Sequence, residues 1–371
     1  MAFTPDDTRW MERALQLAAL GQGTVEPNPM VGCVIVHAGQ VVGEGWHERF
    51  GGPHAEANAL RAAGDRARGA TVYVTLEPCC HFGKTPPCAD AVIAAGVTRV
   101  VAAMADPFPK VAGGGFAQLK AAGISVEQGL CEADARELNA PYLKLLATGM
   151  PWVIAKWAMT LDGKLATREG DSKWISSAAS RTIVHQLRSR MDAVIVGRRT
   201  ADVDDPLLTT RLSTGEAARV ATRIVLDSQA RLSLNSKLVR TAREAPVLIA
   251  VGPEANAQQV AALTAAGCEV VSYLDGDPGK RLEQLLQELG RRRLTNVLVE
   301  GGAEVLGSLL DGGLIDEVHA FIAPKLVGGG EAASPIAGKG ASLMTEALKL
   351  RSPKTKIVDG DVYLSGRLGP G

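Results

Sequence analysis

Three side chains that can bind zinc lie close to one carboxylate in the first part of the chain. His54 and Glu56 are separated by a single alanine, Cys79 follows a proline, and Cys88 comes nine residues after Cys79. One imidazole and two thiolates would give zinc three protein ligands and leave its fourth position to water, which is typical of a catalytic site. Zinc lowers the pKa of such a water to about 7. Glu56, beside His54 but not required as a ligand, could then carry protons.

The spacing favours a deaminase over a structural zinc site. His-x-Glu followed by Pro-Cys is the first part of the signature of zinc-dependent deaminases, in which the next cysteine usually comes three residues after the first. Here eight residues separate Cys79 from Cys88, so residues 80–87 should form a loop at the site. A structural site is the alternative, because Cys80 or His81 could supply a fourth ligand.

The first half of the chain has the pattern of an alternating α/β domain. Strands that alternate with helices predict a parallel or mixed sheet covered on both faces. The apolar spacing and the helix-ending glycines predict helices at 7–20, 54–63, 88–95, 116–122 and 132–147, and strands at 31–36, 40–45, 70–76, 97–104 and 124–127.

The second half has the same style without repeating the sequence. Pro151 cannot continue the helix before it, so we expect domains at 1–149 and 150–371. Strands are expected at 152–159, 193–196, 223–226, 247–251, 269–272, 296–299 and 317–322, helices at 178–190, 255–266, 280–290 and 303–310, and a hairpin at 354–368.

The composition restricts the class of protein. The 371 residues are 46% hydrophobic, and 40 basic side chains balance 40 acidic ones. The lack of a basic surplus argues against extended nucleic-acid binding. No apolar run approaches the roughly 18 residues of a membrane span, and the first residues do not form a signal peptide. We therefore expect a cytoplasmic protein whose six cysteines form no disulfide framework.

Several longer runs of sequence resemble the bifunctional deaminase–reductase family of bacterial riboflavin biosynthesis, the RibD family. The similarity covers nearly the whole chain, and only small departures occur: Cys80 stands where a serine is usual, and Phe108 where an asparagine is usual. The runs that carry the resemblance are 27–32 (PNPMVG), 51–56 (GGPHAE), 75–88 (TLEPCCHFGKTPPC), 161–164 (LDGK), 172–175 (SKWI), 204–211 (DDPLLTTR), 299–302 (VEGG) and 322–326 (IAPKL).

For the first domain the resemblance implies a cytidine-deaminase-like fold. The substrate would be 2,5-diamino-6-ribosylamino-4(3H)-pyrimidinone 5′-phosphate, with Zn²⁺ held by His54, Cys79 and Cys88 and Glu56 as the catalytic acid–base. The positions that match the family's contacts to the base, ribose or phosphate are Asn28, His47, Lys84 and Asp106.

For the second domain the resemblance implies a dihydrofolate-reductase-like fold that uses NADPH to reduce the ribosyl group to ribityl. The usual dinucleotide fingerprint is absent, but glycines after the strand at 296–299 could admit a phosphate at the start of a helix. The cofactor positions are Ala158, Trp174, Thr200, Asp204, Ser228, Gly302, Ala303, Glu304, Val305, Leu306, Gly307 and Ser308. The substrate positions are Ser172, Arg188, Leu208, Arg211 and Glu300, and Lys156 is a candidate proton donor.

Some of these residues have ordinary alternatives. Arg188 could simply interact with the C-terminal dipole of its own helix, and Trp174 could be a core aromatic residue. A nucleic-acid deaminase is the competing enzyme class, although the neutral charge argues against it. We expect a small phosphorylated pyrimidine as the substrate, no nucleic-acid or membrane partner, and a homo-oligomer.

Overall fold

A computed structural model describes residues 3–211 and 219–369 of the chain. The chain divides into two compact units, Met1–Thr148 and Gly149–Gly371, one residue from the predicted boundary. Among the described residues, no helix is both long and apolar enough to cross a lipid bilayer.

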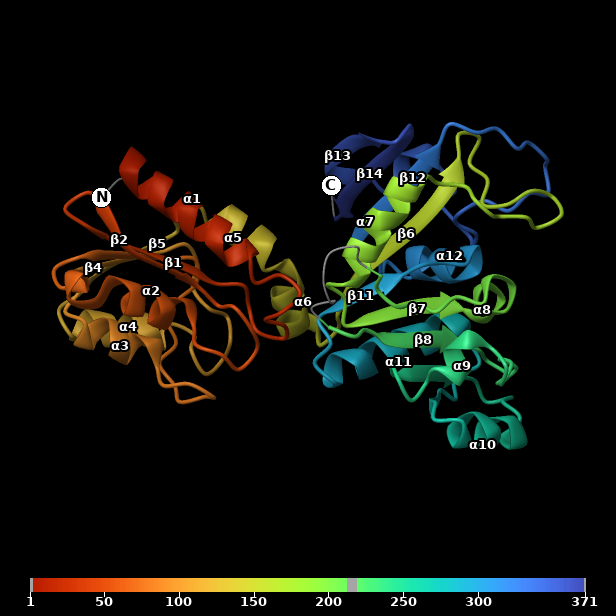
Figure 1. The fold of residues 1–371 in the computed structure, drawn as a ribbon, viewed down its shortest axis with the longest axis horizontal. Helices are drawn as coiled ribbons and strands as arrows, with labels where there is room; N and C mark the ends of the chain where they lie inside the picture. The colour runs from red at the N-terminus through yellow and green to blue at the C-terminus, as the bar shows by residue number, and fades with distance from the viewer. Residues whose placement is uncertain (1–2, 212–218, 370–371) are drawn as a thin grey trace. The chain divides into compact units, whose positions relative to one another are not determined.

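Unit 1 is a mixed five-stranded sheet with helices on both faces (Figure 1). The strand order is β2-β1-β3-β4-β5: β1 pairs antiparallel with β2 and β3, and β3, β4 and β5 run parallel. The strands are β1 (Gly32–His37), β2 (Gln40–Trp46), β3 (Thr71–Val74), β4 (Arg99–Ala102) and β5 (Ser125–Gln128). The helices are α1 (Pro5–Ala19), α2 (Ala55–Ala63), α3 (Cys88–Ala94), α4 (Gly114–Ala121), α5 (Glu132–Leu138) and α6 (Ala140–Thr148), with a 3-10 turn η1 (Gly64–Ala67) after α2.

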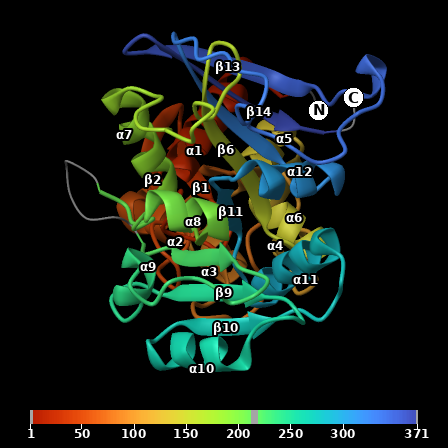
Figure 2. The same cartoon turned by 90° about the vertical axis from the view of Figure 1, so that its right-hand side faces the viewer.

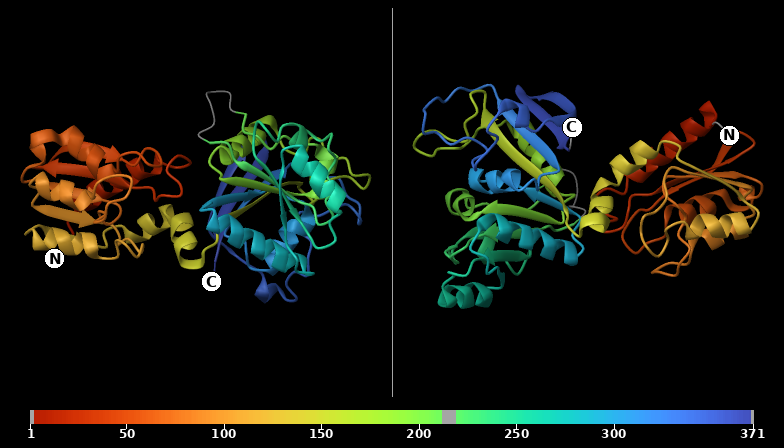
Figure 3. Two further views of the ribbon diagram at one scale, coloured as in Figure 1. Left: turned by 90° about the horizontal axis from the view of Figure 1, so that it is seen from below. Right: turned by 180° about the vertical axis from the view of Figure 1, so that it is seen from behind.

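Alternate residues of β1 build the two cores of this unit. Cys33 and Ile35 pack with residues of α2, α3 and α4, whereas Val34 and Val36 pack with residues of α1 and α5. Figure 3 shows these two helical layers with the sheet between them. Two glycines of β2 let α2 approach closely: a Cβ at Gly43 would lie 2.3 Å from the Ala59 carbonyl oxygen, and one at Gly45 would lie 2.4 Å from the Ala59 nitrogen. This contact fixes α2, and therefore the segment that carries His54 and Glu56.

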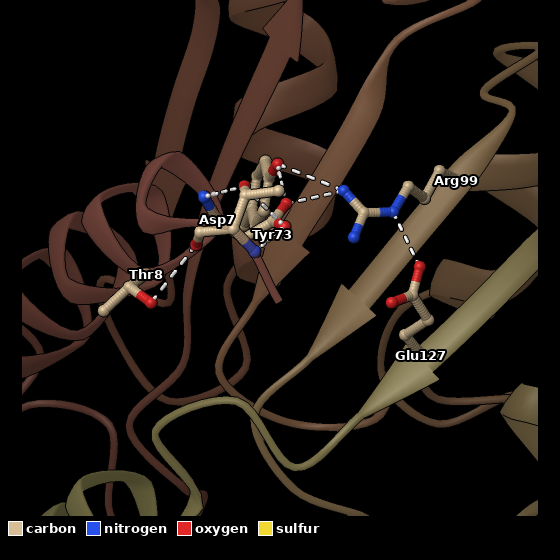
Figure 4. Close-up of polar contacts among 6 residues, drawn as sticks. Asp7, Thr8, Tyr73, Arg99 and Glu127 are labelled. Carbon is tan, nitrogen blue, oxygen red and sulfur yellow. Dashed lines mark hydrogen bonds and ion pairs between the residues drawn. The ribbon is translucent and has the colours of Figure 1, made fainter. Parts of the chain in front are cut away.

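A buried carboxylate ties α1 to the sheet (Figure 4). The Asp7 carboxylate accepts hydrogen bonds from the Tyr73 hydroxyl at 2.7 Å and from Arg99 at 2.6 Å, and it also closes a capping box with Thr4. Arg99 donates in addition to Glu127 on β5 at 2.8 Å. Burial alone would raise the pKa of Asp7, but its hydrogen bonds hold that pKa well below its usual range. The Asp7 carboxylate therefore stays charged and has a structural role.

Unit 2 has a nine-stranded sheet in the order β10-β9-β8-β7-β11-β6-β12-β14-β13. The strands from β10 to β12 run parallel, and β14 and β13 add an antiparallel hairpin that turns at Asp359-Gly360. The strands are β6 (Trp152–Thr160), β7 (Ala193–Gly197), β8 (Thr222–Leu226), β9 (Val247–Val251), β10 (Glu269–Ser272), β11 (Asn296–Val299), β12 (Glu317–Ala323), β13 (Leu350–Val358) and β14 (Asp361–Leu368).

Helices cover both faces of this sheet (Figure 2). Leucines of α11 and α12 form one core with alternate strand residues, and residues of α8, α9 and α10 pack into the core on the other face. The helices are α7 (Ala178–Arg188), α8 (Arg198–Asp204), α9 (Lys237–Arg240), α10 (Ala257–Ala265), α11 (Pro278–Arg291) and α12 (Ala303–Asp311), with a 3-10 turn η2 (Met344–Glu346).

The predicted elements are present with ends shifted by a few residues, with one exception. The single helix predicted at 132–147 is wrong: the structure has α5 and α6, separated at Asn139, whose φ and ψ are −97° and 16°. The short helices α8 and α9 were not predicted. Both have too few residues to give a clear helical pattern of apolar side chains.

Candidate functional site

Three elements bring the predicted metal ligands of unit 1 together. His54 is the N-cap residue of α2, Cys88 is the first residue of α3, and Cys79 lies in the loop after β3. Their ligand atoms all lie within 4.8 Å of one another. His54 Nδ1 is 3.5 Å from Cys79 Sγ and 3.3 Å from Cys88 Sγ.

This triangle has the dimensions of a zinc site. With Zn–S near 2.3 Å and Zn–N near 2.0–2.1 Å, tetrahedral ligand atoms stand roughly 3.5 Å apart. The Cys88 amide donates to Cys79 Sγ at 3.3 Å. Hydrogen bonds from the side chain and backbone of Cys88 lower the pKa of the Cys79 thiol, in spite of its burial. The donor set therefore fits Zn²⁺ with three protein ligands, in keeping with an open catalytic site.

Glu56 lies in the first turn of α2 and is only 3% exposed. Burial, followed by the nearby Cys79 thiolate, raises the pKa of Glu56 to about 7. A bound cation would favour the carboxylate form. The group is not a member of the ligand cluster, so it is available to accept and donate a proton beside the metal.

Neither candidate for a fourth protein ligand joins the cluster among the described residues. The Cys80 thiol points to the 110–111 segment, where it donates to the carbonyl oxygen of Lys110 at 3.7 Å. The His81 ring lies against Phe108, with 5.9 Å between ring centroids. The geometry therefore favours the open site over a structural one.

Thr85, which the sequence analysis did not single out, contacts the far side of the histidine ligand. Its hydroxyl is 3.3 Å from His54 Nε2. When Nδ1 binds a metal, the neutral ring carries its proton on Nε2 and can donate it to this hydroxyl. The 80–87 loop thus supplies an orienting partner for His54.

Asn28 and His47 lie together next to the metal site. The His47 and His54 rings meet edge to face at 5.3 Å. His47 Nδ1 is 3.0 Å from the Pro53 carbonyl oxygen, which can only accept, so Nδ1 carries the proton. Burial, the largest influence, lowers the pKa of His47 and favours the neutral ring. His47 Nε2 then accepts from Asn28 Nδ2 at 3.3 Å, and the Asn28 Oδ1 atom is left to accept from a ligand.

The backbone of Asp106 is bound by Glu77, a second buried carboxylate, which lies in the same segment as the metal ligand Cys79. Glu77 Oε2 accepts from the amides of Asp106 at 3.2 Å and Gly113 at 3.0 Å, and Oε1 accepts from the Phe116 amide at 3.2 Å. Glu77 stands two residues before Cys79. Neither Glu77 nor its role could be recognised from spacing, because its partners lie 29–39 residues away along the chain.

Lys84 lies in the 80–87 loop, where its ammonium is 3.9 Å from the centre of the Phe50 ring. A cation over an aromatic face is attracted by the ring quadrupole. Lys84 is next to Thr85, which contacts the metal ligand His54, so its positive charge lies on the loop at the metal site.

In unit 2, nearly all of the predicted cofactor and substrate positions line one cleft of about 1380 Å³. Typical ligand sites have roughly 300–1,000 Å³, so the cleft has room for a dinucleotide and a second small molecule. Gly307 is the exception: a Cβ there would lie 2.4 Å from the Ala337 backbone, so it serves packing. The predicted residues in the lining are Ala158, Ser172, Trp174, Arg188, Thr200, Asp204, Leu208, Arg211, Ser228, Glu300, Gly302, Ala303, Glu304, Val305, Leu306 and Ser308.

Glu300 is the centre of a charged cluster in this cleft. Its side chain is 6% exposed and accepts two hydrogen bonds from the Arg188 guanidinium, while Lys156 Nζ lies 3.5 Å away. Burial alone would raise the pKa of Glu300, but the charges of Arg188 and Lys156 lower it to about 2. Arg188 is therefore engaged with a carboxylate of another element rather than only with the end of its own helix.

The start of α12 forms another part of the lining. Gly302 is its N-cap residue and provides no side-chain cap, so the first amides of the helix remain available to an anion. Gly301 has a φ of +90°, a conformation that favours glycine. A dinucleotide phosphate therefore fits this part of the cleft.

Comparisons with known proteins agree with both units. Residues 4–104 match the family described as the cytidine and deoxycytidylate deaminase zinc-binding region, and residues 151–364 match the RibD C-terminal domain.

Relatives and solved structures are similar to this chain over nearly its whole length. The riboflavin biosynthesis protein RibD of Actinobacillus pleuropneumoniae is 42% identical, covering 97% of this chain and 95% of the relative, and that of Escherichia coli is 41% identical, covering 96% and 98%. Acinetobacter baumannii RibD has a TM-score of 0.87 at 39% identity, with 98% and 99% of the two chains covered. A Thermotoga maritima structure described as a diaminohydroxyphosphoribosylaminopyrimidine deaminase/5-amino-6-(5-phosphoribosylamino)uracil reductase has a TM-score of 0.83 at 34% identity, with the same coverage.

The metal triangle of unit 1, the cleft of unit 2 and similarity along nearly the whole length lead to one conclusion: the chain belongs to the RibD family of bifunctional riboflavin-biosynthesis enzymes, with a zinc-binding deaminase domain and a reductase domain.

Proposed function

We propose that unit 1 deaminates 2,5-diamino-6-ribosylamino-4(3H)-pyrimidinone 5′-phosphate by hydrolysis. The observation that carries the proposal is the His54–Cys79–Cys88 triangle with the buried Glu56 carboxylate beside it. When bound there, zinc makes hydroxide available near neutral pH. Glu56 accepts the proton of the attacking water and passes it to the departing ammonia, which are the two proton transfers of the reaction.

The residues around the triangle bind the substrate in this proposal. Asn28 Oδ1 and the Asp106 carboxylate are acceptors for N–H groups of the base, and His47 fixes the direction of the Asn28 amide. Lys84 supplies a cation for the phosphate.

We propose that unit 2 then uses NADPH to reduce the ribosyl group of the deaminated product to ribityl. The nicotinamide supplies a hydride to C1′ of the open-chain imine. The lining residues at 302–306, with Ala158, Trp174, Thr200, Asp204 and Ser228, hold the cofactor. Arg281 donates to the Ser228 hydroxyl at 3.3 Å and suits the additional phosphate of NADPH.

The Glu300 cluster binds the second substrate. Glu300 accepts from hydroxyl or amino groups and fixes Arg188 and Lys156 in the cleft. Ser172, Leu208 and Arg211 line the remaining part, where the Arg211 guanidinium suits the 5′-phosphate. Lys156 is our candidate for the proton donor to the imine nitrogen.

The order of the two reactions gives a direct test. With zinc and NADPH present, the purified full-length protein should release ammonia from the pyrimidine phosphate, and NADPH oxidation should follow. NADPH oxidation without ammonia release would contradict the proposed order. Release of ammonia from an RNA or DNA oligonucleotide instead would support a nucleic-acid deaminase.

We also propose a cytoplasmic location, because the proposed substrates are phosphorylated metabolites and NADPH, and, as a separate proposal, a homo-oligomeric state. A light-scattering mass equal to one chain, 38.8 kDa, would contradict the oligomer, and recovery in the membrane fraction of cells would contradict the location.

A further inference from the structure

The helical segment 132–148 contains a break that the sequence pattern does not predict, and the break has a specific partner. Asn139, between α5 and α6, is only 1% exposed. Its Oδ1 accepts from the Met30 amide at 2.8 Å, and its Nδ2 donates to the Met30 carbonyl oxygen at 2.9 Å. One buried amide therefore satisfies both backbone groups of a residue 109 positions away. Met30 follows Asn28 by two residues, so Asn139 fixes the backbone that carries Asn28.

One turn further on, Tyr142 contacts the other predicted substrate residue. Its hydroxyl donates to Asp106 Oδ1 at 2.9 Å, and the Phe108 amide donates to the same oxygen at 3.0 Å. Within the described part of the chain, both hydrogen bonds to the Asp106 carboxylate thus go to Oδ1. The geometry fixes the rotation of the carboxylate and leaves Oδ2 to accept from a ligand. Asp106 is only 7% exposed, so its carboxylate has few other orientations.

The two contacts act on different loops from one helical segment. Asn139 holds the Pro29–Met30 backbone, and Tyr142 orients the carboxylate of a residue whose amide is already held by Glu77. The segment 132–148 lies outside the residues that match the deaminase zinc-binding region, 4–104. None of its residues is a metal ligand in the described cluster.

We propose that Asn139 and Tyr142 are positioning residues of the deaminase site, which set the Asn28 and Asp106 acceptors to receive N–H donors of an aminopyrimidine. The inference rests on the proposed function of unit 1. It assigns no chemical step to either residue: both act through the groups that touch the substrate. Their loss should therefore raise the KM of deamination and leave the metal site and the proton transfers intact.

Tyr142→Phe is the principal test, because it removes only a hydroxyl. The lost hydroxyl no longer fixes the Asp106 carboxylate, and a substrate contact that depends on this orientation should weaken on the order of tenfold. In full-length zinc-loaded protein, the KM for the pyrimidine phosphate in ammonia release should rise about tenfold, with kcat within about threefold and unchanged zinc content.

Tyr73→Phe is a matched control in the same unit. Tyr73 also donates its hydroxyl to a buried aspartate, at 2.7 Å from Asp7 Oδ1, but it does so in the core beneath α1 (Figure 4). Its loss should lower the melting temperature without changing the KM. An equal rise in KM in both variants would overturn the inference, because it would mean that loss of stability alone moves the KM.

A double variant tests whether Tyr142 acts through Asp106. In the Asp106→Asn background, Tyr142→Phe should change the KM by less than about twofold, because the group that it positions has been altered. The full tenfold effect in that background would overturn the inference.

Asn139→Asp tests the second contact with a side chain of the same shape. A carboxylate can accept from the Met30 amide but cannot donate to the Met30 carbonyl oxygen, so the KM should rise while zinc remains bound. A folded Asn139→Asp protein with the wild-type KM would overturn the assignment of Asn139. If the wild-type protein releases no ammonia, the proposed function fails first; if it is active and Tyr142→Phe has the wild-type KM, only this inference fails.

Discussion

A buried glutamate lies beside the metal triangle of unit 1 and another lies in the cleft of unit 2, and their surroundings shift the two pKa values in opposite directions. Glu56 is 3% exposed and lies beside the thiols of the metal triangle, and burial raises its pKa to about 7. The Glu300 side chain is 6% exposed and lies against Arg188 and Lys156, whose charges lower its pKa to about 2 in spite of burial. Burial raises the pKa of a carboxyl, and nearby cations can outweigh that effect, as they do at Glu300 but not at Glu56. Glu56 suits proton transfer, whereas Glu300 is a fixed anion that orients two cations.

Among the variants that test this comparison, we expect the largest loss of activity for Glu56→Gln. The amide is nearly the same size but cannot accept the proton of water or pass it on. General acid–base catalysis contributes about 10²–10⁴-fold, and two transfers depend on this group, so ammonia release should fall by about 10⁴-fold or more. Zinc content and the reduction of separately supplied deaminated substrate should stay at wild-type levels. Glu12→Gln, an exposed change in the same unit, is the control. Loss of zinc in Glu56→Gln would instead make Glu56 a ligand.

Substitutions can distinguish the cysteines of the metal triangle from the neighbouring Cys80. Cys88→Ser should lose most of its zinc and its deaminase activity, because Cys88 Sγ is one of three ligand atoms. Cys80→Ser should keep both, because the Cys80 thiol is directed to the Lys110 carbonyl oxygen. Metal analysis of the purified variants checks this. Equal loss of zinc from both would show a site with four protein ligands.

A smaller loss is expected for the fixed anion of the reductase cleft. Glu300→Gln keeps the shape of the side chain but leaves Arg188 and Lys156 without their counter-charge. Hydrogen bonds to charged groups are worth about 1.5–3 kcal/mol, so kcat/KM for NADPH-dependent reduction should fall by about 10–100-fold. Ammonia release should not change. Glu283→Gln, on the exposed side of α11, should leave both activities intact. A wild-type reductase in Glu300→Gln would contradict a role in orienting the substrate.

The smallest expected effect is on stability as a function of pH. The folded pKa of Glu300 is about 2, below the unfolded value of about 4.3. The unfolded chain therefore binds the proton first as the pH falls, and the contribution of Glu300 is complete above about pH 4.3 and is lost toward pH 2. The difference in free energy of unfolding between the wild type and Glu300→Gln, measured with urea, should be constant near neutral pH and shrink below about pH 4. A difference that grows as the pH falls would reverse the assigned sign.

Much of the fold could be predicted because its signals are local. The alternation of apolar strands with helices that end in glycine predicted nearly every strand and helix of both units. The prediction of one helix at 132–147 is wrong only at Asn139, where the helix is interrupted. The residues on either side do form helices, but the Asn139 amide bonds to Met30. A distant partner that satisfies a polar side chain outweighs the small differences in helix propensity.

The sequence by itself determined the chemistry of the metal site. His54 and Glu56 are neighbours at the start of one helix, and Cys79 and Cys88 bracket one loop, so their types and spacing carry the information. Only the tertiary structure decided what surrounds these groups. Glu300 meets Arg188 across 112 positions, Asn139 meets Met30 across 109, and Tyr142 meets Asp106 across 36. Such contacts depend on the order of strands in a sheet and on the course of the loops between them. The physical reason is that hydrophobic burial, which drives folding, is non-directional, so the local pattern specifies the elements but not which polar side chains will meet when they pack.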